Sequence, residues 1–175
     1  MKKITLILCL LSTALACNDQ AKIEAASVNY FDLKKYFSSE AKRLQILTPL
    51  IKKTVTQNGI SETKQLKISN WETELKPFLN ADINKSAWKN AFKVTIKNQI
   101  TRYTNTSEKI PVKELIVAKK NNRIISVKAI LTTSNLLYTS TDTLTYVPRK
   151  HYEIKKTQKI KLLKLKTYQI SGSFD

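Results

Sequence analysis

The chain has 175 residues, of which 42% are hydrophobic and 8% aromatic, and this composition excludes a disordered polypeptide. A formal net charge of +18 favours anionic partners, namely phospholipid or glycolipid headgroups, acidic glycans or nucleic acid, although lysines that form no single block can also simply solvate a surface. Only two glycines occur, which excludes glycine-rich phosphate loops and dinucleotide-binding fingerprints.

Residues 1–16 predict an export signal that is removed from the mature chain. Met1-Lys2-Lys3 is followed by an apolar run over residues 4–11 and by a small-residue region over residues 12–16. The apolar run is too short to span a bilayer, which requires ~20 residues as a helix. Removal of the signal takes away two of the 31 basic residues, so 29 remain against 13 acidic ones and the mature net charge is +16.

The four residues Ala14-Leu15-Ala16-Cys17 resemble the lipobox of bacterial lipoproteins. In that family the cysteine thiol receives a diacylglycerol and becomes the new N-terminus, and leucine usually stands three residues before it, where this chain has Ala14. The resemblance implies a cell-envelope protein that a lipid on Cys17 attaches to a membrane. Ordinary signal peptidase accepts the same residues, so free secretion is the alternative. Cys9 is lost with the signal, and lipidation then explains the one cysteine that remains.

The mature chain is expected to consist of a tether over residues 17–27 and a single α+β domain over residues 28–175, helical over 28–92. Apolar residues at steps of three and four predict an amphipathic helix from Val28 to Val55, which Pro49 kinks or divides near Leu47 and which Asn58-Gly59 stops. Ser69-Asn70-Trp71-Glu72 has the capping-box form and predicts a second, shorter helix with Ser69 as its N-cap.

Residues 93–175 predict short strands, because apolar and polar residues alternate there. Asn121-Asn122 predicts a hairpin turn, Pro148 ends a strand, and the alternation changes phase at a bulge or turn near Leu162-Leu163. The predicted fold is α+β, with N-terminal helices packed on a curved antiparallel sheet meander of five to seven strands.

Neither a catalytic centre, a cofactor site nor a metal site is predicted. His151 is the single histidine and lies beside a lysine, which is a poor setting for zinc. Glu114, Asp142 and Glu153 lie in or near predicted strands, and a hydrolase that uses such carboxylates stays open as an alternative.

Basic residues of the last third form the candidate site for an anionic ligand. Strand alternation places three lysines on one face, and the others precede or follow them. An alternative is that these lysines only protect a sheet face or edge from pairing with other chains. The candidate residues are Arg149, Lys150, Lys155, Lys159, Lys161, Lys164 and Lys166.

The sequence therefore favours a non-enzymatic, membrane-anchored lipoprotein that binds an anionic envelope component, such as lipid headgroups or glycans, or a protein partner. A carrier that encloses a lipid chain or a peptide between sheet and helices is the first alternative, on fold-level analogy. Nucleic acid ranks last among the anionic partners because the chain is expected to be exported.

Overall fold

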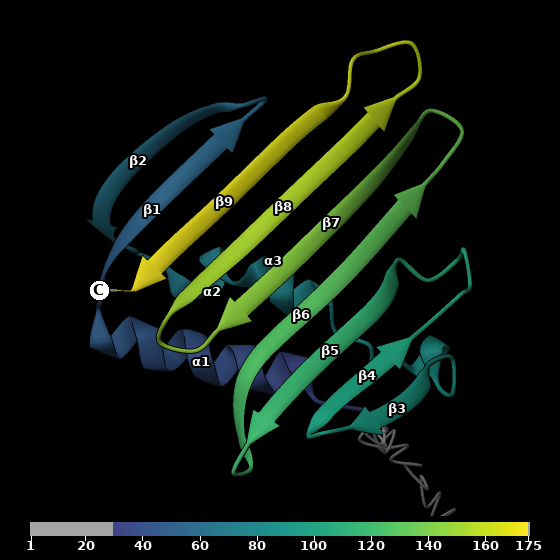
Figure 1. The fold of residues 1–175 in the computed structure, drawn as a ribbon, viewed down its shortest axis with the longest axis horizontal. Helices are drawn as coiled ribbons and strands as arrows, with labels where there is room; N and C mark the ends of the chain where they lie inside the picture. Colours follow the sequence, from purple (N-terminus) through teal and green to yellow (C-terminus); the bar gives the residue numbers. More distant parts are fainter. Residues whose placement is uncertain (1–29, 175) are drawn as a thin grey trace, which may run out of the picture.

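A nine-stranded antiparallel sheet makes up most of the computed structural model, which describes residues 30–174 (Figure 1). The strand order is β2-β1-β9-β8-β7-β6-β5-β4-β3, so a meander of seven strands is extended beyond β9 by the hairpin of β1 and β2. The strands are β1 (Leu50–Gln57), β2 (Ile60–Lys67), β3 (Lys93–Lys97), β4 (Ile100–Thr104), β5 (Val112–Lys120), β6 (Arg123–Ser134), β7 (Tyr138–Val147), β8 (His151–Ile160) and β9 (Lys166–Phe174).

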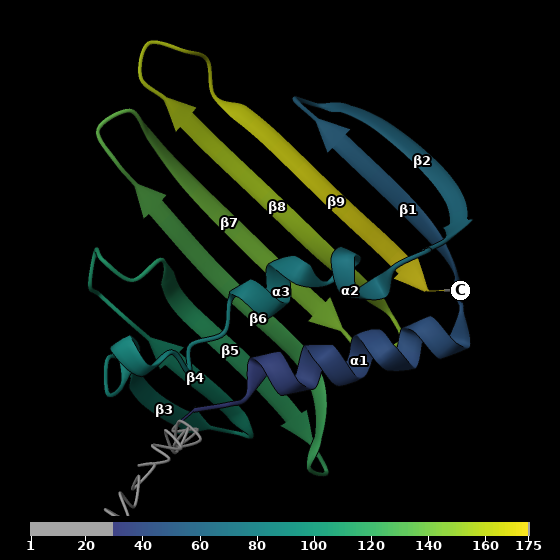
Figure 2. The same ribbon diagram turned by 180° about the vertical axis from the view of Figure 1, so that it is seen from behind.

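The helices are α1 (Leu33–Leu47), α2 (Trp71–Glu74) and α3 (Lys76–Asn80), with a 3₁₀ turn at Ser86–Trp88. The Asp32 side chain caps α1 by accepting a hydrogen bond of 2.8 Å from the backbone N–H of Lys35. Helix α1 ends where Thr48 adopts a left-handed conformation before Pro49, a residue that disfavours helical geometry in its predecessor. The helices lie across one face of the sheet, and β6–β9 extend well beyond them (Figure 2).

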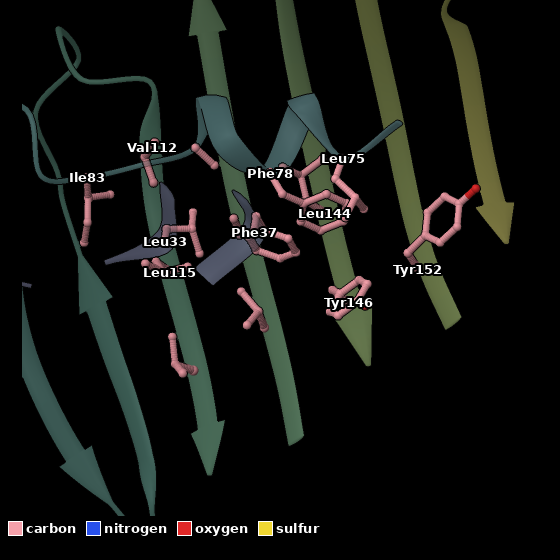
Figure 3. Close-up of a cluster of buried hydrophobic side chains, with 14 of the residues drawn as sticks. Leu33, Phe37, Leu75, Phe78, Ile83, Val112, Leu115, Leu144, Tyr146 and Tyr152 are labelled. Carbon is pink, nitrogen blue, oxygen red and sulfur yellow. The ribbon is translucent and has the colours of Figure 1, made fainter. Parts of the chain in front are cut away.

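The core lies between the helices and the covered half of the sheet. Leu33, Phe37, Ala41 and Leu44 form the buried apolar face of α1, at steps of four, four and three residues. The Phe37 ring stacks on Phe78 of α3 at 4.7 Å between centroids and meets Tyr146 of β7 edge-on at 5.2 Å (Figure 3). Among the described residues, the buried members of this core run from Leu33 to Tyr152, all downstream of the predicted signal.

The predicted fold class is wrong in its strand number and in its helical half. The sheet has nine strands rather than five to seven, and the helices are few and mostly short. Ile51 and Val55, four residues apart, fit one helix face, but they are equally the alternate residues of a strand, and in β1 they point toward the helices with Lys53 between them. The helix ends at Leu47, as the expected division near Pro49 has it, but a strand and not a second helical segment follows.

The Asn58-Gly59 pair closes the β1–β2 hairpin and is not a helix stop. Both residues have positive φ, 49° and 89°, as a two-residue hairpin turn requires. The alternating run of residues 93–103, which is typical of a single strand, is divided between β3 and β4 of a hairpin, with positive φ at Asn98 and Gln99. In α2 the N-cap is Asn70 rather than Ser69, and its side chain accepts a hydrogen bond from Thr73 N–H.

Three local predictions of the β-rich half are confirmed. The hairpin at Asn121-Asn122 joins β5 to β6, with positive φ at both asparagines. Strand β7 ends at Val147, directly before Pro148. The change of phase near Leu162-Leu163 is the turn between β8 and β9.

Candidate functional site

The seven basic residues of the candidate site do not form one surface. Four of them gather at the β8–β9 turn: Lys159, Lys161, Lys164 and Lys166. Lys155 lies farther down β8, on the face away from the helices, and forms an ion pair of 3.2 Å with Glu153. Arg149 and Lys150 lie in the β7–β8 turn, at the opposite end of the sheet.

The β8–β9 turn is part of a larger structure, which we call the tip: Asn58–Gly59 with Ile60, Asn135–Leu137 and Lys161–Leu165, together with Lys159 and Lys166 at the strand ends beside the last turn. These three turns lie at the same end of the strands (Figure 1). Lys161 N–H donates to the Leu137 carbonyl at 2.9 Å, which joins the second turn to the third. Asn58 N–H donates to the Thr167 carbonyl at 2.9 Å, and Thr167 N–H donates back to the Asn58 side chain at 3.0 Å. The three turns are therefore held side by side.

The tip carries unbalanced positive charge. None of its four lysines (Lys159, Lys161, Lys164, Lys166) forms an ion pair with any residue of the 30–174 range, whereas six such pairs lie elsewhere in it. The three turns themselves contain no aspartate or glutamate. Such a cluster attracts anions and repels cationic or strongly basic partners.

A shallow hollow of about 180 Å³ lies next to the tip, on the side of the sheet that bears the helices. Lysine ammonium, amide and phenol groups are donors for phosphate oxygens, and the lining of this hollow offers all three kinds. Lys156 lies 3.5 Å from the Asp142 carboxylate, which leaves Lys166 as the lysine of the hollow without an ion pair among the described residues. The lining residues are Gln57, Asn58, Lys156, Gln158, Lys166, Thr167 and Tyr168.

Arg149 lies where its charge acts on a buried carboxylate, Glu40 of α1. Glu40 accepts hydrogen bonds from the Tyr146 hydroxyl and from Arg43, whose Nη2 lies 2.6 Å from a carboxylate oxygen. Burial opposes ionisation of Glu40, but the hydrogen bonds from Arg43 and Tyr146 and the charges of Arg43 and Arg149 outweigh it and hold the pKa of Glu40 below its usual value. Burial and the same carboxylate raise the pKa of Tyr146. This cluster ties α1 to β7.

A second carboxylate, Glu74 of α2, ties its helix to the sheet in the same way. Tyr152 of β8 donates its hydroxyl to Glu74 at 2.5 Å, and Lys53 of β1 lies 2.7 Å from it. Burial, followed by the hydrogen bond to Glu74, raises the pKa of Tyr152. Both carboxylates are occupied by structural partners.

The carboxylates named as hydrolase candidates do not face one another. Asp142 points to the helix side of the sheet and lies near Lys156, whereas Glu153 points to the other side and accepts a hydrogen bond from Gln169. Glu114 pairs with Arg102. His151 is exposed at the start of β8, and within residues 30–174 no three His, Cys, Asp or Glu side chains come together as a metal site would require.

The space between helices and sheet is filled by aromatic and aliphatic side chains. Trp71, Tyr146 and Tyr152 have no more than 2% of their surface exposed. A groove of about 500 Å³ between α1 and the start of α2 is lined mainly by polar residues, among them Lys42, Gln45 and Glu72. Neither feature supports a carrier that encloses an apolar cargo.

The sequence predictions missed the apolar part of the tip. Leu136, Leu137, Leu162, Leu163 and Leu165 are all exposed, as is Ile60. The sequence did contain a signal for these exposed leucines. Leu162 and Leu163 lie between lysines at a predicted turn, where strand alternation gives them no buried face to pack on. A bulge or turn is predicted near Leu162-Leu163, but none of these apolar residues is given a role in a site. Cys17 and the tether lie outside the described residues.

No helix of residues 30–174 combines the length and the hydropathy that crossing a bilayer demands. Comparison of the chain with family models, curated proteins and solved structures gives no match.

Proposed function

We propose that this protein is an exported lipoprotein, held by a lipid on Cys17, whose domain binds the anionic phospholipid surface of a bacterial envelope membrane without performing a reaction. The observation that carries the proposal is the tip: four lysines without ion pairs among the described residues, next to a hollow lined by phosphate donors. For a tethered protein the membrane is the nearest anionic surface.

The charge of the whole chain supports the same partner. A mature net charge of +16 attracts the domain to an anionic bilayer over about one Debye length, ~8 Å at physiological salt. Within that range each lysine near the surface contributes roughly 1 kcal/mol. The tip concentrates four such residues, which favours it as the contacting end.

The test is the binding of the mature chain, with Cys17→Ser to remove the lipid, to vesicles of phosphatidylglycerol and phosphatidylcholine. The four-lysine variant (Lys159, Lys161, Lys164 and Lys166, each →Gln) should bind anionic vesicles on the order of 100- to 1000-fold more weakly than the parent chain. The parent should lose affinity as salt is raised and should ignore pure phosphatidylcholine.

A matched variant removes four positive charges from the other end of the sheet. Lys97, Lys119, Lys120 and Arg123 are exposed at the β3–β4 and β5–β6 turns. Replacing each of these four by Gln should reduce binding by far less than the tip variant. Equal losses in the two variants would mean that total charge and not the tip determines binding, and no binding of the parent to anionic vesicles would refute the proposed function.

A further inference from the structure

We infer that the exposed leucines of the tip enter the apolar edge of the bilayer, so that the domain itself anchors in the membrane at a second point besides the lipid. This inference rests on the proposed function, because the lysines bring the tip to the surface. Its first support is exposure: Leu162 is 98% and Leu136 is 87% exposed, on two turns that a hydrogen bond joins. Leu137, Leu163 and Leu165 stand beside them with more than half of their surface exposed.

The backbone of the β8–β9 turn provides an independent argument. Leu162 has a φ of +66°, in the left-handed region where glycine and asparagine are favoured. Leucine at this position costs conformational energy and, since it is almost fully exposed, gains no packing in return. A residue that serves neither the turn nor the core is accounted for by a contact outside the chain.

The surroundings of the leucines identify the partner as a bilayer. Lys161 and Lys164 flank Leu162 and Leu163 in the chain, and no acidic residue occurs in the three turns. Apolar side chains beside lysines match a surface whose interior is apolar and whose outer layer is anionic, as in an anionic phospholipid layer. Lysine stems lie along apolar surface while the ammonium groups stay at the headgroups. The leucines also project from turns, which suits penetration of a soft surface.

The chain allows a clean fluorescence test, because its only cysteines are Cys9 and Cys17. The mature chain with Cys17→Ser is therefore free of cysteine, and Leu162→Cys supplies a single site for an environment-sensitive dye. The matched control is Ile46→Cys at the end of α1, where Ile46 is 83% exposed at the opposite end of the sheet.

With phosphatidylglycerol vesicles we expect the dye at position 162 to shift its emission to the blue by 10 nm or more, on the order typical of transfer from water to an apolar setting. Nitroxide groups on the lipid chains should quench it. The dye at position 46 should show neither change. A tip variant with Leu136, Leu137, Leu162 and Leu163 each →Ser should bind the same vesicles at least 10-fold more weakly at high salt, where the apolar contribution remains.

Two other results would overturn the inference. Binding to anionic vesicles with unchanged emission at position 162 would leave the proposed function standing and reject insertion. A blue shift without vesicles that grows with protein concentration would mean that the leucines contact a second copy of the chain. Absence of any binding by the parent chain would instead reject the proposed function itself.

Discussion

Glu40 links α1 to β7 through a hydrogen bond at its buried carboxylate. Its carboxylate is 10% exposed and accepts hydrogen bonds from Tyr146, 106 positions later, and from Arg43 on the next turn of the helix. A buried carboxylate with this many partners favours its charged form. Because the decisive partner lies on a distant strand, neither the role of Glu40 nor its burial was predictable from sequence spacing.

Glu40→Gln should lower the free energy of unfolding by about 1–3 kcal/mol at neutral pH, because it removes the charge that Arg43 and Tyr146 satisfy. The pKa of Glu40 is lowered in the folded chain, so its stabilising effect is complete above the unfolded pKa of about 4.3 and is lost as pH falls through the folded pKa. Denaturant melts at pH 7 and at pH 3 measure this.

The pH dependence distinguishes the charge from simple packing. The difference in stability between parent and variant should shrink as the pH falls below about 4. An equal difference at both pH values would show that the glutamine merely packs poorly. Glu62, which is fully exposed on β2, supplies the control, since Glu62→Gln should leave the stability nearly unchanged at either pH.

At the scale of elements, the β8–β9 turn contains a leucine that the proposed membrane contact uses and that should lower the stability of the fold. Leu162→Asn should raise the free energy of unfolding by roughly 0.5–1 kcal/mol, because asparagine tolerates the left-handed backbone better than leucine. The measurement is the denaturant midpoint of the mature chain. Leu163→Asn is the matched control: Leu163 is exposed in the same turn without a positive φ, so this change should not stabilise. Destabilisation by Leu162→Asn would mean that the leucine supports the fold after all.

Elements of the second half were predictable because their signals are local. A pair of asparagines, a proline and a change of phase each mark a strand end within two or three residues. The β1–β2 hairpin was missed for a physical reason: Ile51 and Val55 suit both periods, and the preceding helix made continuation the simpler interpretation. The β-branched residues of 54–56 and the Asn-Gly pair were the better evidence, because Asn-Gly is the preferred two-residue hairpin turn.

At the scale of the whole molecule, the sequence predicted a positive charge and a preference for anionic partners, but not where the charge gathers. Strand alternation correctly places Lys155 and Lys159 on one face, while the register puts Lys166 opposite Gln158 on the helix side. Side chains that project from opposite faces of the sheet can still lie near one another at the ends of its strands. Only the order of the strands, which single-sequence patterns do not specify, brings the other two turns beside them.

The membrane attachment predicted at Cys17 can be tested on the protein from its native cells. A mass spectrum of the mature protein from the cells that naturally express it should show a cysteine N-terminus that carries diacylglycerol. Cys17→Ala should leave the chain unprocessed or release it from the membrane fraction. An unmodified Cys17 would mean a secreted basic protein, for which soluble acidic glycans become the partners to test.

The tip lies at the ends of strands rather than on a face of the sheet. Its position therefore sets the orientation that the domain would take on a membrane. The three turns lie at one end of β6–β9 (Figure 1), so a domain that rested on them as proposed would stand with these strands steep to the bilayer plane. In that orientation the threonine-rich outer face of β7 and the helix layer would both be exposed to the aqueous compartment, parallel to the membrane normal. In the proposed orientation the edge strands β2 and β3 would stand at the flanks of the domain, and its area of contact with the lipid would be narrow.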